Sequence, residues 1–282
     1  HIGGGKSMVV KVLKMQISSM LRKKETVLTF FIVMAFMFVN FYYNMYLNYK
    51  VGNISQMQDF VKMLTLSDWT ISGYFFTDFL PLLVVIPTAC SYIADRDTRI
   101  KLYMEARCGK RTYWYSKLLS VFIVTFLIFT IPFLIEIIMS AICFNISSNG
   151  DPSLFEYYQT IENDANYELA SLYINNKILY AMVITLIFGI ICGILATFNF
   201  AVTTIPIFRF RIFTFFPIYI LLYAIIFIGR VAKPDFTINY MLIIRMFASG
   251  SRNYMVYGIF LVALIIASLS MINIKIRRDE IL

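Results

Sequence analysis

The residue types that usually carry catalysis are scarce in this chain. Its only histidine is His1, so no Ser-His-Asp or Cys-His arrangement and no histidine-based metal site can be assembled. The four cysteines show no Cys-x-x-Cys spacing and stand at Cys90, Cys108, Cys143 and Cys192. Their mostly apolar surroundings indicate packing residues rather than a disulfide framework or a zinc cluster. We expect no metal site.

A Gly-Lys-Ser run at Gly5, Lys6 and Ser7 resembles the tail of a phosphate-binding loop. Such a loop needs a further glycine five residues before its final Gly-Lys and a strand in front, because backbone N–H groups must wrap the phosphates. This sequence has neither. We interpret residues 1–7 as a remnant of cloning ahead of a native start at Met8. We therefore expect no ATP-hydrolysing site and no enzymatic activity in this chain.

One carboxylate, Glu136, lies inside a long apolar run, four residues after Pro132. Ionisable residues inside a membrane span are costly and often functional. Two interpretations remain open. Glu136 could contact a substrate or form a gate in a transport pathway, or it could reach water or a neighbouring span from the outer interface.

The elements that must position these residues are helices in a bilayer. Of the 282 residues, 60% are apolar and 15% are charged, whereas a typical soluble domain is about 25% charged. A bilayer-spanning helix needs about 20 predominantly apolar residues. The predicted fold is an all-α membrane protein with a transmembrane domain over 26–278, whose six spans cover about 26–46, 74–94, 118–144, 178–207, 212–229 and 254–274. Pro81 and Pro87 would kink the second span or interrupt its hydrogen bonding.

Residues 8–25 predict an amphipathic helix that is too polar to span the bilayer. Val9, Leu13, Ile17 and Met20 recur at helical spacing, and the basic residues Lys11, Lys14 and Arg22 occupy another face. Such a helix lies in the membrane interface, with its lysines toward anionic headgroups.

The distribution of basic residues predicts the orientation of the spans. With both termini in the cytoplasm, 18 of the 25 lysines and arginines fall on the inside. Four of the remaining seven lie between the fifth and sixth spans, beside the apolar run 240–244. Re-entrant helices that dip into the outer leaflet would account for both observations, because long basic side chains can reach back to the surface.

The inside loop over 95–111 is dense in charges of both signs. Asp95, Arg99 and Leu102 lie at i, i+4 and i+7, so a short helix could present charge and an apolar contact to a cytoplasmic partner. The alternative is a solvated loop whose charges only set the topology.

The order of these elements resembles the membrane subunit of an ATP-binding-cassette exporter, within the ABC type 2 permease family, also called type V exporters. Asp95 fits the acidic residue with which the family's loop begins, and Arg111, Tyr115 and Lys117 fit its closing positions. The family's Gly-Thr pair is missing, with Thr98-Arg99 nearby at a different offset.

The resemblance implies that the loop forms a coupling helix seated in a groove of a separate cytoplasmic ATPase. The N-terminal helix also contacts that ATPase, and re-entrant helices follow the fifth span. ATP and Mg would be bound by two ATPase copies and no cofactor by this chain, which would pair with a second permease. The implied coupling residues are Asp95, Arg96, Asp97, Arg99, Glu105, Arg111 and Lys117.

The expected function is export of a hydrophobic or amphipathic substrate, such as a peptide, an antimicrobial or a drug-like molecule. The expected location is the plasma membrane of a bacterium. The lipid bilayer is an expected partner, and nucleic acid is not. An ion-coupled secondary transporter is one alternative, for which paired intramembrane carboxylates and inverted repeats are expected. A non-transporting assembly or sensor subunit is the other.

Overall fold

The protein is all-helical over the residues that the structure describes. This computed structural model describes residues 3–49, 51, 53, 57–67, 70–97, 100–148, 150, 169–205, 211–231 and 254–281. The elements are α1 (Gly3–Leu21), α2 (Lys24–Asn48), α3 (Ile71–Asp97), α4 (Ile100–Cys108), α5 (Lys110–Cys143), α7 (Ala170–Asn175), α8 (Lys177–Thr203), the 3₁₀ helix η3 (Arg211–Phe215), α9 (Phe216–Val231) and α11 (Tyr254–Ile281). The predicted all-α class is confirmed.

Five of the described helices are long and apolar enough to cross a membrane, which makes this a multi-pass membrane protein. Their apolar segments are Lys24–Asn48, Ile71–Thr88, Lys110–Cys143, Lys177–Thr203 and Met255–Arg278. The span expected over 212–229 corresponds to a shorter apolar helix, Phe213–Phe227. The predicted re-entrant helices fall mainly on 232–253, outside the described residues.

Helices α5 and α3 differ in detail from the expected spans. Helix α5 begins at Lys110, eight residues before the expected start of the third span at residue 118. Gly109 separates α4 from α5 with a φ of 82°, a conformation that glycine adopts without steric cost. Helix α3 continues through Pro81 and Pro87. The charged stretch before the third span is therefore a rigid extension of that span.

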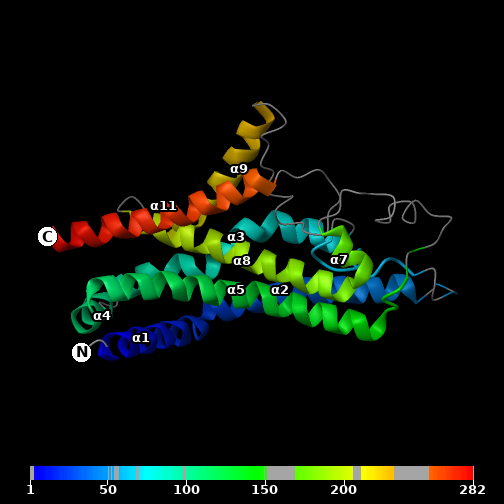
Figure 1. The fold of residues 1–282 in the computed structure, drawn as a ribbon, viewed down its shortest axis with the longest axis horizontal. Coiled ribbons are helices and arrows are strands. Elements are labelled where there is room, and N and C mark those ends of the chain that lie inside the picture. The colour runs from blue at the N-terminus through cyan, green and yellow to red at the C-terminus, as the bar shows by residue number, and fades with distance from the viewer. Residues whose placement is uncertain are drawn as a thin grey trace.

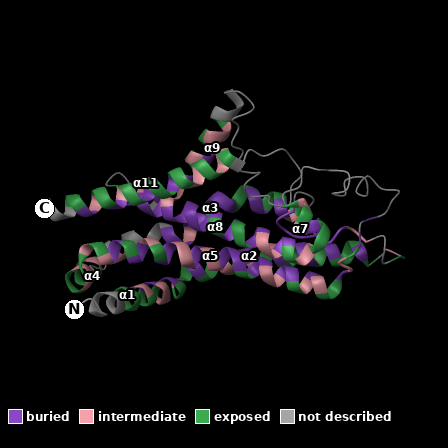
Figure 2. Cartoon of the chain, viewed as in Figure 1, coloured by how far each residue is buried: buried purple, intermediate pink, exposed green. Residues whose placement is uncertain are grey.

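The described helices form an elongated bundle with two distinct ends (Figure 1). The N-terminus, α4 and the C-terminal end of α11 lie at one end, called here the α4 end. Helix α7 and the C-terminal ends of α2 and α5 lie at the other, called the α7 end. Helix α8 is central, packed against α5, α11, α3 and α7, and the buried residues follow the middle of the bundle (Figure 2).

Two glycines allow the closest helix pair, α5 and α8, to approach each other. Gly189 and Gly193 are one helical turn apart on α8. A Cβ atom at Gly189 would lie 2.0 Å from Thr130 Oγ1, and one at Gly193 would lie 2.7 Å from the ring of Phe122. In lipid, helices associate through such close packing because the hydrophobic effect gives no net driving force between spans.

Helix α1 packs mainly along α5. Its buried side chains are Val12, Gln16 and Met20, spaced four residues apart. We expected the apolar face to include Val9, but Val9 is exposed. The helix instead turns the neighbouring stripe of Val12, Gln16 and Met20 toward α5. Gln16 Nε2 donates to the carbonyl oxygen of Tyr113 at 3.4 Å. The basic residues predicted for the outer face, Lys11, Lys14 and Arg22, are all exposed.

Candidate functional site

Four side chains meet at the α4 end, around the carboxylate of Asp95. Lys117 Nζ lies 2.6 Å from Asp95 Oδ2. Tyr113 Oη donates to the same oxygen at 3.1 Å, and Lys23 Nζ lies 3.9 Å from Oδ1. We call Lys23, Asp95, Tyr113 and Lys117 the inner cluster. It joins α3 and α5 to the junction between α1 and α2.

Helix geometry explains this meeting. Tyr113 and Lys117 are four residues apart on α5 and therefore share one face. The Lys117 side chain is only 4% exposed and that of Asp95 13%. A buried ammonium is costly without a partner, and the direct ion pair with Asp95 offsets that cost. Removing the Asp95 carboxylate leaves the Lys117 ammonium buried without this partner, whereas Asp95 would still have Lys23 nearby if Lys117 were removed.

The short helix α4 is fixed on one face and open on the other. Lys101 and Glu105 form an i, i+4 ion pair at 3.7 Å, and Lys101 Nζ lies 5.1 Å from the ring centre of Trp114 on α5. No residue of α4 is fully buried, although the Glu105 side chain is only 7% exposed. The exposed apolar side chains Ile100, Leu102 and Tyr103 are 51%, 63% and 58% accessible. Helix α4 thus contacts the bundle through the face that carries Lys101 and leaves these apolar side chains accessible.

A cysteine, Cys108, is the last residue of α4. Cys108 Sγ donates to the carbonyl oxygen of Met104 at 2.9 Å, and partial burial raises the pKa of the thiol, which disfavours the reactive thiolate. Over the described part of the chain, no group of three or more His, Cys, Asp or Glu side chains could hold a metal ion.

The predicted coupling residues have different surroundings. Asp95 and Lys117 contact each other directly. Asp95 belongs to α3, while the short helix begins at Ile100. Glu105 pairs with Lys101, and Arg111 is exposed at the start of α5. Arg99 and the side chains of Arg96 and Asp97 lie outside the described residues.

Glu136 is buried in the bundle, at 1% exposure. Its Oε1 atom accepts three hydrogen bonds: from Asn40 Nδ2 at 2.9 Å, from the Thr65 backbone N–H at 2.9 Å and from Thr65 Oγ1 at 2.7 Å. Its described contacts are thus with α2 and with the loop between α2 and α3. A carboxylate surrounded by donors in this way holds a loop in place.

That loop contains a buried segment, residues 57–67, which is packed inside the bundle without forming a helix. All its residues from Asp59 to Ser67 are buried. The carbonyl oxygen of Met63 accepts hydrogen bonds from Asn40 Nδ2 and Asn44 Nδ2, each at 2.7 Å. Non-helical backbone is tolerated at membrane depth only where protein or water satisfies its polar groups, and the asparagines of α2 do this here.

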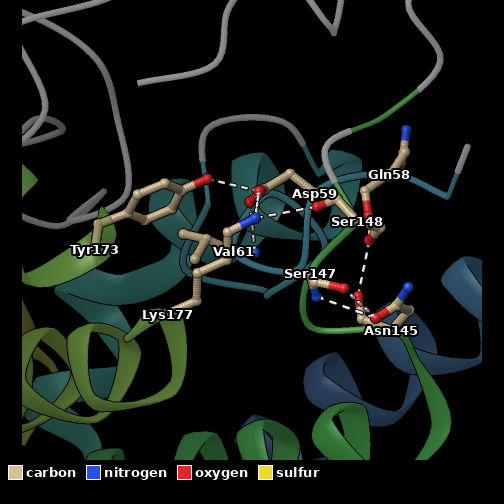
Figure 3. A network of polar contacts seen from close by, with 8 residues as sticks. All are labelled: Gln58, Asp59, Val61, Asn145, Ser147, Ser148, Tyr173 and Lys177. Atoms are coloured by element: carbon tan, nitrogen blue, oxygen red, sulfur yellow. Dashed lines mark hydrogen bonds and ion pairs between the residues drawn. The ribbon is translucent and has the colours of Figure 1, made fainter. Parts of the chain in front are cut away.

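A second polar cluster fixes the buried segment at the α7 end (Figure 3). Asp59 Oδ2 accepts from Tyr173 Oη at 2.6 Å and forms an ion pair with Lys177. Asp59 Oδ1 accepts from the Val61 backbone N–H at 2.9 Å. Lys177 also donates to the carbonyl oxygen of Ser148 at 3.0 Å. We call Asp59, Ser148, Tyr173 and Lys177 the outer cluster, which joins the buried segment to α7, α8 and the end of α5.

Our sequence reasoning missed the outer cluster and the asparagines of α2. One signal was available for the asparagines: Asn40, Asn44 and Asn48 recur every four residues inside an apolar span and therefore share one face. Amides in hydrocarbon need partners, so this stripe predicts a polar contact. Nothing comparable distinguished Asp59, whose neighbours show no periodicity.

The comparisons with known proteins give no relative. No family model matches this chain, and no curated protein or solved structure matches it.

Proposed function

We propose that this chain is the membrane subunit of an ATP-binding-cassette exporter, with α4 as the helix that contacts a separate cytoplasmic ATPase. The observation that carries the proposal is the arrangement of α4. Its exposed face carries Ile100, Leu102 and Tyr103, and the inner cluster connects the helices on either side of it. Both chain ends lie at the same end of the bundle as α4 (Figure 1).

In this proposal the α4 end is cytoplasmic, and η3 with α9 supplies the fifth of six spans. ATP binding draws two ATPase subunits together, and α4 moves with the ATPase to which it is bound. The inner cluster passes that motion to α3, α5 and the α1–α2 junction, so that the spans shift between two arrangements. The residues of this chain contribute binding and mechanical coupling, while nucleotide hydrolysis takes place in the partner.

The complex proposed here contains two permease chains and two ATPase chains in the plasma membrane of a bacterium. A pathway between two permeases suits a hydrophobic or amphipathic substrate, such as a peptide, an antimicrobial or a drug-like molecule. This substrate class rests on the resemblance to the ABC type 2 permease family.

Affinity purification tests the proposal directly. The tagged chain is purified in a mild detergent from cells of its source, and ATP hydrolysis is measured in the eluate. We expect a stoichiometric ATPase that is retained by the wild type and lost from a Leu102→Asp, Tyr103→Asp variant. Ile174→Asp is the matched control, because Ile174 is 64% exposed at the α7 end.

The outcomes separate the alternatives. Loss of the ATPase from the α4 variant but not from the control supports the proposal. A wild-type eluate without a nucleotide-hydrolysing subunit contradicts it. Substrate uptake driven by an ion gradient in liposomes containing only this chain would instead favour a secondary transporter, and the absence of any transport would favour an assembly or sensor subunit.

A further inference from the structure

An open groove lies at the junction of α1 and α2, at the boundary between a basic and an apolar surface. Its lining consists of Arg22, Lys24, Glu25, Val27, Leu28 and Phe31. Arg22 and Lys24 are exposed, and no ion pair of either one is found among the described residues. Val27, Leu28 and Phe31 are 42%, 58% and 63% exposed. The groove therefore combines accessible cations with accessible apolar side chains.

The apolar side of the groove continues along α2. Phe38 and Tyr42, seven and eleven residues after Phe31, are 46% and 74% exposed. These positions follow the same face of the helix. The apolar segment of α2 begins at Lys24, so the two basic residues lie at the level where hydrocarbon meets headgroups. A ligand that fills the groove must have a polar head at Arg22 and Lys24 and a long apolar part along α2.

We propose that this groove binds an anionic phospholipid. The headgroup phosphates would lie against Arg22 and Lys24, and one acyl chain would follow Leu28, Phe31 and Phe38. Basic residues immediately beside a span attract anionic lipids. Glu25 also lines the groove, so the three ionisable side chains sum to a formal charge of one positive unit and favour an anionic over a zwitterionic lipid.

Charge complementarity disfavours a second copy of the chain as the occupant. In a two-fold symmetric dimer the same patch meets itself. Each groove carries a formal charge of one positive unit, so two facing copies would repel each other even though Glu25 lies in the lining. A lipid phosphate supplies the opposite charge instead, and it does so without any dependence on the proposed transport function.

Lipid binding can be measured on the purified full-length chain. The protein is delipidated in an uncharged detergent and titrated with phosphatidylglycerol or phosphatidylcholine of identical acyl chains, and bound lipid is counted by native mass spectrometry. We expect phosphatidylglycerol to bind about tenfold more tightly. Arg22→Gln with Lys24→Gln should abolish this preference, and Glu25→Gln should increase it several-fold, because the two changes alter the charge of the groove in opposite directions.

Lys11→Gln with Lys14→Gln is the matched control, since it removes the same charge from the exposed face of α1. The preference should survive in this control. An equal loss in both double variants would overturn the proposal in favour of general attraction to a basic surface. If soluble glycerol phosphate competed with phosphatidylglycerol as well as the intact lipid does, the groove would be a small-anion site. If the protein lost its bound lipid on dimerisation, the groove would belong to the contact with a second copy.

Discussion

Lys117 Nζ lies 2.6 Å from Asp95 Oδ2. This ion pair links α3, which precedes the short helix α4, to α5, which follows it. The two residues are 22 positions apart, and both side chains are largely buried. The ion pair therefore holds the α4 end together from within the chain. The exposed face of α4 remains accessible to another protein.

Breaking the inner ion pair should destabilise the protein. Asp95→Ala leaves the Lys117 ammonium buried without its counter-charge, which should lower the free energy of unfolding by about 3 kcal/mol. Thermal unfolding in detergent, followed by fluorescence, measures this. Adding Lys117→Met to Asp95→Ala should recover a large part of the loss, because it removes the unpaired ammonium as well. Equal instability of the single and double variants would contradict a direct ion pair.

The same pair tests coupling separately from stability. Replacing both residues with apolar ones of similar size, Asp95→Leu with Lys117→Met, removes the charges together and should unfold within about 1–2 kcal/mol of the wild type. If the pair transmits motion, this variant keeps the ATPase bound but loses the effect of this chain on ATP hydrolysis. Unchanged regulation of hydrolysis would leave the pair with a structural role only.

The Asp59–Lys177 ion pair should control access to the buried segment 57–67. Leu64 is 1% exposed, so a Leu64→Cys variant should react slowly with a charged maleimide. Adding Asp59→Ala removes the acceptor of Tyr173, Lys177 and the Val61 N–H, and labelling should become at least about tenfold faster as local opening increases.

Two controls make that measurement interpretable. Cys143 is exposed near the α7 end, so it is replaced with serine in every variant. Ser147→Cys, at an exposed position of the same end, should label quickly whether or not Asp59 is present. Slow labelling at residue 64 in the Asp59→Ala background would mean that the remaining contacts hold the segment without the outer cluster.

Glu136 offers a test between the two interpretations of its buried carboxylate. The three hydrogen bonds all end on Oε1, so Glu136→Gln can keep these acceptor contacts and should cost about 1 kcal/mol or less. Glu136→Ala leaves Asn40 and Thr65 donors unsatisfied, each costing about 1–3 kcal/mol. Unfolding in detergent compares the two variants. A glutamine variant that is stable but inactive would instead assign the charge to the transport pathway.

The sequence predicted the helices well because their signal is local. Runs of about 20 apolar residues define a span wherever they occur, and the basic residues of α1 are on the exposed side, as expected. The stripe that faces α5 was displaced to Val12, Gln16 and Met20. Leu13 and Ile17 of the predicted stripe lie one position after Val12 and Gln16 and are half-buried. Only the position of α5 decides which of these two neighbouring stripes is covered, and the local sequence pattern does not contain that information.

The polar clusters were harder to predict because they depend on tertiary distances. Asp95 and Lys117 both belonged to the predicted coupling set, yet only the positions of α3 and α5 bring their side chains together. The outer cluster joins residues more than 100 positions apart, Asp59 with Tyr173 and Lys177. No helical or strand period connects such residues, and a short non-helical segment leaves no pattern of its own.

Helix packing gives the last prediction, at Gly189. A Cβ atom there would lie 2.0 Å from Thr130 Oγ1, so Gly189→Leu must push α8 away from α5 and should lower the free energy of unfolding by about 3 kcal/mol. Gly258→Leu on α11 is the control, because a Cβ atom at Gly258 meets nothing within 4 Å; it should change stability by less than about 1 kcal/mol. Thermal unfolding of both variants checks this. Equal effects would contradict the assignment of close helix packing to Gly189, because both substitutions place the same residue at a helical glycine.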